Sequence, residues 1–178
     1  MRSSDGVGIA VPAGRVAPAG EERCELGQAV GVQHPSQSGP SHGGPELERN
    51  VLGGPLEECG TEPLTGFFRD GCCRTGPEDL GSHTICAVVS AEFLEHQRSI
   101  GNDLITPAPM YRFPGLMPGD RWCVTAVNWL RAHRDGAAAP VVLASTHERV
   151  LDLVPLDVLR QHAVDVPDDL GSLGDDLP

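Results

Sequence analysis

The segment HTICAVVSAEFLEHQRSIG, residues 83–101, decides the fold class because it places a strand directly before a helix. Its first part, Thr84 to Val89, is short, rich in β-branched residues and apolar on both faces, which predicts a strand that is covered on two sides. Ser90 is suited to cap the N-terminus of the helix, and Gly101 can end the helix in the left-handed conformation. The residues predicted to share one helix face are Phe93, Leu94, Gln97 and Ile100.

The sequence after residue 101 repeats the alternation of strand and helix. Residues 107–119 contain four prolines and predict an extended surface segment that ends in a turn. A second strand over 122–127 leads into a short helix over 129–134, which Gly136 ends, and residues 141–145 predict a third strand. Residues 150–154 fit a helix face or a fourth strand paired with the third, and we favour the strand. Pro155 then begins a final helix, with Leu156, Leu159 and Ala163 facing inward.

These elements predict a single α+β domain over residues 49–164, with a small sheet of three to four strands and helices on at least one face. Residues 50–82 are rich in turn formers yet retain apolar side chains, which predicts a long structured loop at the N-terminal side of the domain. Residues 1–48 lack any hydrophobic period and are predicted to be disordered. Residues 165–178 hold five Asp and no basic residue, which predicts a solvated acidic tail.

The composition excludes several classes of function. The formal net charge is −12, and none of the 13 basic residues is a lysine, so we expect no nucleic-acid partner. The absence of lysine also excludes Schiff-base and P-loop chemistry. The first fifteen residues do not resemble a secretory signal, and no apolar run is long enough for a membrane helix. We therefore expect a cytoplasmic protein with no membrane partner, whose six cysteines are reduced thiols.

Four long strings carry a resemblance to a known family: NVLGGPLE from residue 50, GFFRDGCCRTGPEDLGSHT from residue 66, PGDRWC from residue 118 and STHER from residue 145. With them, the chain resembles a bacterial family of unknown function, numbered twenty-two thirty-seven, over about residues 50–163. The resemblance supports the limits of the domain. It implies no defined reaction, cofactor or partner.

The loop over residues 69–83 gathers thiols, a histidine, carboxylates and guanidinium groups within a short stretch. The candidate nucleophiles are Cys72 and Cys73, and the groups that could favour their thiolates are Arg69, Arg74 and His83. A positive charge near a thiol lowers its pKa and so increases the reactive thiolate form. In the structural alternative, one cysteine belongs to the core and the arginines hold the loop in place through Asp70 and Glu78.

A second candidate group follows the third predicted strand, where a loop can present binding residues. His147 could act as a general base, with Glu148 or Glu78 orienting its ring, or it could be an exposed histidine at a turn. Trp122 could line a pocket or belong to the core. The candidate ligand-binding residues are therefore Arg69, Arg74, Glu78, Glu148 and Trp122.

A metal site is the third hypothesis, because zinc takes thiolate and imidazole ligands. Its ligands could come from Cys59, Cys72, Cys73, His83, Cys86, Cys123 and His147, and the set we favour is Cys73, His83 and His147. Cys86 and Cys123 lie in predicted strands, where a buried free thiol is more common. No C-x2-C pair supports the metal site. The residues thus favour a small-molecule enzyme or sensor that uses a Cys/His/Arg site. The alternatives are a non-catalytic binding or scaffolding module with a structural loop, and a Cys/His metal protein. The sequence leaves open whether the protein is an enzyme, and it names no cofactor, substrate or oligomeric state.

Overall fold

The structure is a computed structural model that describes Cys24 and residues 48–165. Most of the predicted disordered segment 1–48 and nearly all of the predicted acidic tail 165–178 lie outside the described residues. The proposed limits of the domain stay a prediction. Within residues 48–165, no helix has the length and apolar character needed to cross a bilayer.

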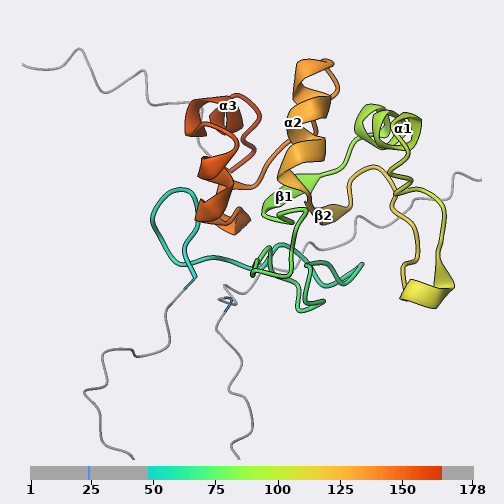
Figure 1. Ribbon diagram of the computed structural model, residues 1–178, viewed down its shortest axis with the longest axis horizontal. Helices are drawn as coiled ribbons and strands as arrows, with labels where there is room; N and C mark the ends of the chain where they lie inside the picture. Colours follow the sequence, from blue (N-terminus) through green and yellow to red (C-terminus); the bar gives the residue numbers. More distant parts are fainter. Residues whose placement is uncertain (1–23, 25–47, 166–178) are drawn as a thin grey trace, which may run out of the picture.

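The structure combines helices and strands around a small sheet, which confirms the mixed helix and strand class (Figure 1). The strands are β1 (Ile85–Val88) and β2 (Arg121–Val124), and the α-helices are α1 (Ala91–Ser99), α2 (Ala126–Arg134) and α3 (Leu156–Arg160). Short 3-10 helices are η1 (Pro109–Tyr111), η2 (Leu143–Ser145) and η3 (Glu148–Asp152). In the part of the chain that the structure describes, the sheet has two antiparallel strands.

The segment 83–101 folds as its local pattern predicts. The hydroxyl oxygen of Ser90 accepts a hydrogen bond from the amide of Phe93 at 3.1 Å, which satisfies one of the free donors at the start of α1. Gly101 has a φ of +86°, the left-handed conformation that ends a helix. Phe93, Leu94 and Gln97 are buried, so the predicted inner face of the helix is confirmed.

The third and fourth predicted strands are wrong. Val141 forms only isolated bridges, to Ala87 and to Ala163, and η2 follows directly. The carboxylate of Asp165 accepts hydrogen bonds from the amides of Leu143 and Ala144, both at 2.8 Å, and so occupies donors that a neighbouring strand would need. Residues 148–152, which overlap the predicted fourth strand, form η3.

The helices confirm the rest of the predicted pattern, with shifted limits. The helix α2 begins three residues earlier than predicted, so β2 ends at Val124 and Thr125 becomes the N-cap. The final helix α3 starts after Pro155, and Leu159 is fully buried. Gly136 has a φ of +76° just beyond α2.

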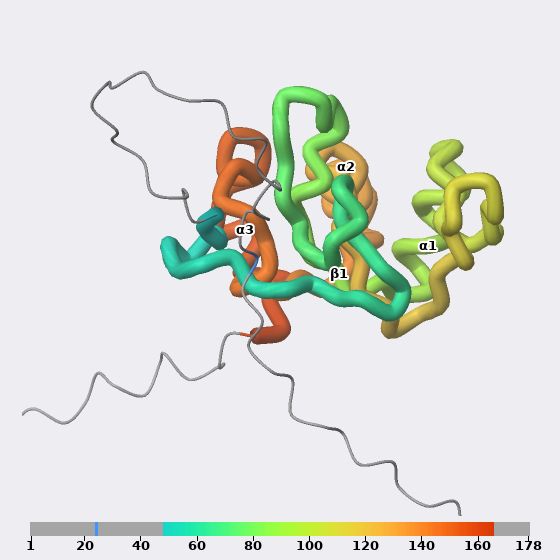
Figure 2. Tube along the Cα trace, turned by 90° about the horizontal axis from the view of Figure 1, so that it is seen from below, coloured from blue at the N-terminus to red at the C-terminus, as the bar shows by residue number. Residues whose placement is uncertain are grey.

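The two faces of the β1–β2 pair contact different parts of the chain. The helices lie on one side of the sheet and residues 48–82 on the other (Figures 1 and 2). Because side chains alternate along a strand, Ile85, Ala87, Trp122 and Val124 enter the hydrophobic core with the helices. Their neighbours Cys86 and Cys123 belong to a second cluster with Cys59, Cys73 and Val142. The second face of the sheet is thus covered largely by cysteine.

Candidate functional site

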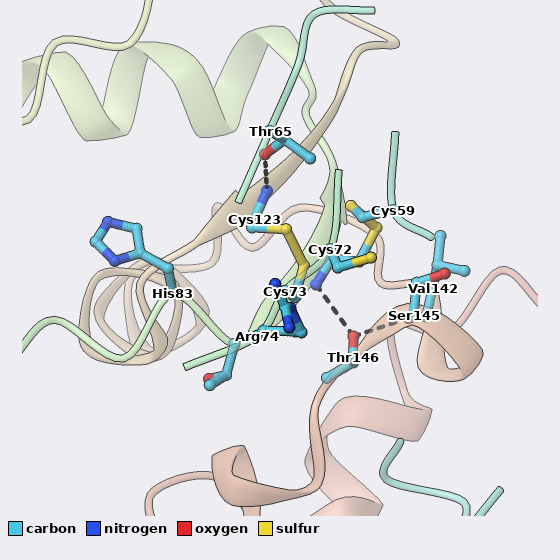
Figure 3. Close-up of a disulfide and its surroundings, with 12 residues drawn as sticks. Cys59, Thr65, Cys72, Cys73, Arg74, His83, Cys123, Val142, Ser145 and Thr146 are labelled. Atoms are coloured by element: carbon cyan, nitrogen blue, oxygen red, sulfur yellow. Dashed lines mark hydrogen bonds between the residues drawn. A yellow bond between two sulfur atoms is a disulfide. The ribbon is translucent and has the colours of Figure 1, made fainter. Parts of the chain in front are cut away.

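All six cysteines are paired in disulfides, which corrects the expectation of free thiols. The pairs are Cys24–Cys72, Cys59–Cys86 and Cys73–Cys123, whose partners are 48, 27 and 50 positions apart in the sequence. Two of these bonds join the N-terminal loop to the sheet (Figure 3). In this form neither Cys72 nor Cys73 offers a thiolate, so a nucleophilic role for either would require prior reduction.

The sheet brings two of these cysteines side by side. Cys86 and Cys123 are directly opposite in the register of β1 and β2. The amide of Cys86 donates to the hydroxyl of Thr146 at 3.1 Å, and that of Cys123 donates to the hydroxyl of Thr65 at 2.7 Å. The two cysteines therefore form a non-hydrogen-bonded pair, the arrangement in which opposite side chains lie closest. Each nevertheless bonds to a different cysteine of the loop.

The result is a compact group of buried sulfur atoms. The sulfurs of Cys59, Cys73 and Cys86 all lie within 4.8 Å of one another, and Cys123 is bonded to Cys73. All four residues are at most 1% exposed. Among the described residues, Cys59, Cys73 and Cys86 of the wider candidate set meet in this way, whereas the favoured set of Cys73, His83 and His147 does not, so the favoured set is corrected. Figure 3 shows the ring of His83 directed away from the disulfides.

The arginines of the 69–83 loop hold the loop itself. The guanidinium of Arg74 forms an ion pair with Asp70 and lies over the ring of Phe68, 5.5 Å from its centroid. The other oxygen of Asp70 accepts from the amide of Cys72 at 3.0 Å. Arg69 lies over Trp122 at 4.9 Å. The arginines therefore have the structural role that the sequence analysis gave as the alternative to thiol activation. Of the two predicted partners, Asp70 is the one that pairs with Arg74.

His83 is paired with Asp79, a residue that the sequence analysis did not single out. The ring Nδ1 of His83 lies 2.7 Å from Oδ1 of Asp79, whose side chain is fully buried. Thr75 donates to the other carboxylate oxygen at 3.0 Å. Burial alone would raise the pKa of Asp79, but the hydrogen bonds from His83 and Thr75 and the charge of His83 outweigh it and lower that pKa.

His147 is buried, with both ring nitrogens hydrogen-bonded. Its Nδ1 accepts from the amide of Arg149 at 3.0 Å, which caps η3, and its Nε2 lies 2.7 Å from a carboxylate oxygen of Glu48. Since Nδ1 accepts, Nε2 carries the proton and donates to Glu48. The expectation of an exposed turn histidine is therefore wrong. The ring is held by Glu48 in place of Glu78 or Glu148, and both of those carboxylates are exposed.

Trp122 is 7% exposed and packs against Phe113, with 5.3 Å between ring centroids. It belongs to the core. The sequence analysis gave this role as one of two possibilities for Trp122, the other being to line a pocket.

A pocket of about 650 Å³ lies away from the cysteines. Its walls come from residues 61–63 of the N-terminal loop and from the proline-rich segment 105–120. A second pocket of about 270 Å³ lies beside it and shares Ile105, Leu116 and Met117 with it. Both are lined mainly by apolar side chains, and their ionisable residues are Glu62, Asp120 and Glu95, so none is basic. The first is a shallow depression that is largely open to solvent, with a volume in the range of small-molecule sites.

These features define a small α+β domain whose N-terminal loop is fastened to a two-stranded sheet by disulfides. The chain belongs to the family described as an uncharacterized protein conserved in bacteria (DUF2237), whose model matches residues 49–163. The resemblance noted in the sequence is thereby confirmed. No curated protein matches the chain.

Proposed function

We propose that this domain is a non-catalytic binding module, and that its ligand is a small apolar molecule with a positive charge, such as an alkylamine. The observation that carries the proposal is the pocket between residues 61–63 and 105–120, which combines apolar walls with acidic residues alone. A site of this kind binds through apolar contact and uses a few polar groups for orientation.

The state of the Cys/His/Arg loop supports a binding role over a catalytic one. An enzyme with a thiol nucleophile needs a thiolate beside a base that is free to take a proton. Here Cys73 is 0% exposed and disulfide-bonded, and the nitrogens of His147 are both occupied. The arginines are engaged with Asp70 and Trp122, so they stabilise the loop.

The charge of the pocket defines the ligand class. Glu62 and Asp120 line the larger pocket, and Glu95 lines the smaller one. A carboxylate ligand would be repelled by these groups, whereas an ammonium group would be attracted. Ile105, Leu116 and Met117 would contact the hydrocarbon part of the ligand in both pockets.

The test is a titration of the full chain with hexylamine, hexanol and hexanoate, followed in a two-dimensional proton–nitrogen spectrum. We expect the amide signals of residues 61–63 and 105–120 to move, with affinity falling from the amine to the alcohol to the carboxylate. Glu62→Gln should weaken the binding of hexylamine by about two- to fivefold, as expected for a partly exposed charge pair. The affinity for hexanol should not change.

The matched control is Glu148→Gln, which removes an exposed carboxylate that lines neither pocket. It should not change the affinity for any of the three probes. The proposal fails if hexanoate binds as tightly as hexylamine, or if the signals that move lie outside the two pocket segments.

A further inference from the structure

We propose that, when the two inner disulfides are reduced, Cys59, Cys73, Cys86 and Cys123 form a binding site for a divalent metal ion that prefers sulfur ligands, such as Zn²⁺. This site is separate from the proposed ligand pocket and uses none of its residues. It also differs from a Cys/His centre, because neither His83 nor His147 belongs to the sulfur group.

The distances between the sulfur atoms are close to those of a metal centre. Tetrahedral zinc holds its thiolates at about 2.3 Å, which places neighbouring sulfurs about 3.8 Å apart. In the oxidised protein three of the sulfurs already lie within 4.8 Å of one another. Opening the two bonds requires bonded sulfurs to separate by about 2 Å, a shift that side-chain rotation can supply. The fourth sulfur, Cys123, starts from bonding distance to Cys73.

Hydrogen bonds that do not depend on the disulfides keep the four cysteines together. The backbones of Cys86 and Cys123 are fixed by the sheet and by the buried hydroxyls of Thr146 and Thr65. The loop is held separately, because the amide of Cys59 donates to the carbonyl of Gly71 at 2.8 Å. The hydroxyl of Ser145 also donates to the carbonyl of Glu58 at 2.9 Å. Metal sites depend on such supporting contacts to orient their ligands.

The chemistry balances with a dithiol reductant and no other reagent. Each of two dithiol molecules gives two electrons and two protons to one protein disulfide and becomes a disulfide itself. The four protein thiols then release up to four protons as the metal ion binds their thiolates. The reverse exchange re-forms both protein disulfides and releases the metal ion, because two molecules of the disulfide form of the reductant each accept two electrons from one cysteine pair. The site would therefore hold metal only under reducing conditions.

The third disulfide provides an internal control. Cys24 and Cys72 form their own cluster with Leu56 and are not part of the sulfur group. Replacing both by serine removes two of the six cysteines and leaves all four proposed ligands. Cys59→Ser removes one proposed ligand.

The experiment uses the full chain, unfolded in urea with a dithiol reductant, separated from the reductant, and refolded without oxygen in the presence of Co²⁺. We expect one Co²⁺ per chain, a sulfur-to-cobalt charge-transfer band and the strong visible absorption of tetrahedral cobalt, all displaced by Zn²⁺. The Cys24→Ser/Cys72→Ser variant should behave in the same way. Cys59→Ser should weaken Co²⁺ binding by at least about tenfold. Replacing a residue that only supports a metal ligand already lowers metal affinity by about that factor, and Cys59 is itself a proposed ligand.

X-ray absorption of the zinc-loaded wild-type protein makes the test independent of how well the variants fold. Four sulfur neighbours at about 2.3 Å would support the proposal. It is overturned if no charge-transfer band appears in the refolded wild-type protein, if nitrogen or oxygen atoms form most of the first shell, or if the Cys24→Ser/Cys72→Ser variant loses the metal.

Discussion

Asp79 accepts hydrogen bonds from both the backbone amide and the ring Nδ1 of His83, each at 2.7 Å, although its side chain has no exposure to solvent. The carboxylate thus fixes the turn that leads into β1. Its pKa is lowered in the folded state, so it stabilises the protein only while it is ionised.

We therefore expect the stability of the wild-type protein to fall as the pH drops below about 4, the region between the ordinary and the lowered pKa of Asp79. Asp79→Asn should lower the free energy of unfolding at pH 7 by about 1.5 to 3 kcal/mol, because hydrogen bonds to a charged group are lost. It should also flatten the acid side of the stability curve. Urea unfolding at several pH values measures both effects. Glu78→Gln, next to it on the loop, should change neither.

Two threonines near β2 should respond oppositely to the same substitution. Thr65→Val leaves the buried amide of Cys123 without an acceptor, so we expect a loss of about 1 to 3 kcal/mol. The hydroxyl of Thr125 is buried and, among the described residues, has no hydrogen-bond partner. Thr125→Val should therefore be neutral or stabilise the protein by up to about 1 kcal/mol. Thermal unfolding of the two variants side by side tests this prediction. Equal losses of stability in Thr65→Val and Thr125→Val would contradict it.

The inner disulfides should each contribute strongly to stability. Cys73 and Cys123 close a loop of 50 residues, and the chain-entropy model gives about 4 kcal/mol for a loop of that length. We expect Cys73→Ser/Cys123→Ser to lower the free energy of unfolding by about 3 to 4 kcal/mol in urea without reductant. In the presence of a reductant the difference from the wild-type protein should largely disappear. A loss below about 1 kcal/mol would mean that the pair is not cross-linked in solution.

A histidine pair near α2 should make the protein less stable in mild acid. Nδ1 of His133 lies 3.0 Å from Nε2 of His162, and burial together with His133 lowers the pKa of His162 below 6.5. The folded state therefore resists protonation of His162, so stability is highest above about pH 6.5 and decreases as the pH falls below it. His162→Gln should reduce the loss of melting temperature between pH 7 and pH 5. An unchanged loss would show that other groups cause it.

The sequence allowed the local elements to be predicted where their determinants are near in the chain. Ser90, Gly101 and the spacing of Phe93 and Leu94 define α1 within a few residues, and the structure agrees. The strand predicted over 141–145 failed for the opposite reason. Its β-branched residues fit a strand, but the groups that occupy its amides come from Asp165, which lies some twenty residues further along the chain.

The candidate site was only partly predictable for a related reason. The density of Cys, His and Arg in residues 69–83 predicted a reactive thiol, but both cysteines of this segment are in disulfides. It could not reveal that Cys59 and Cys73 meet Cys86 and Cys123, because the partners are 27 and 50 residues apart. The expectation of a cytoplasmic protein argued for thiols. The even number of cysteines was the observation that could have favoured pairing.

The disulfides that fasten residues 59 and 73 to the sheet also affect when the protein matures. A chain made by a ribosome carries only thiols, so the cross-linked form dates from its first contact with an oxidant and not from its synthesis. The thiol form and the cross-linked form share one sequence but would differ in resistance to proteases. Because reduction restores the thiols, the proportion of the two forms would follow the redox conditions around the protein.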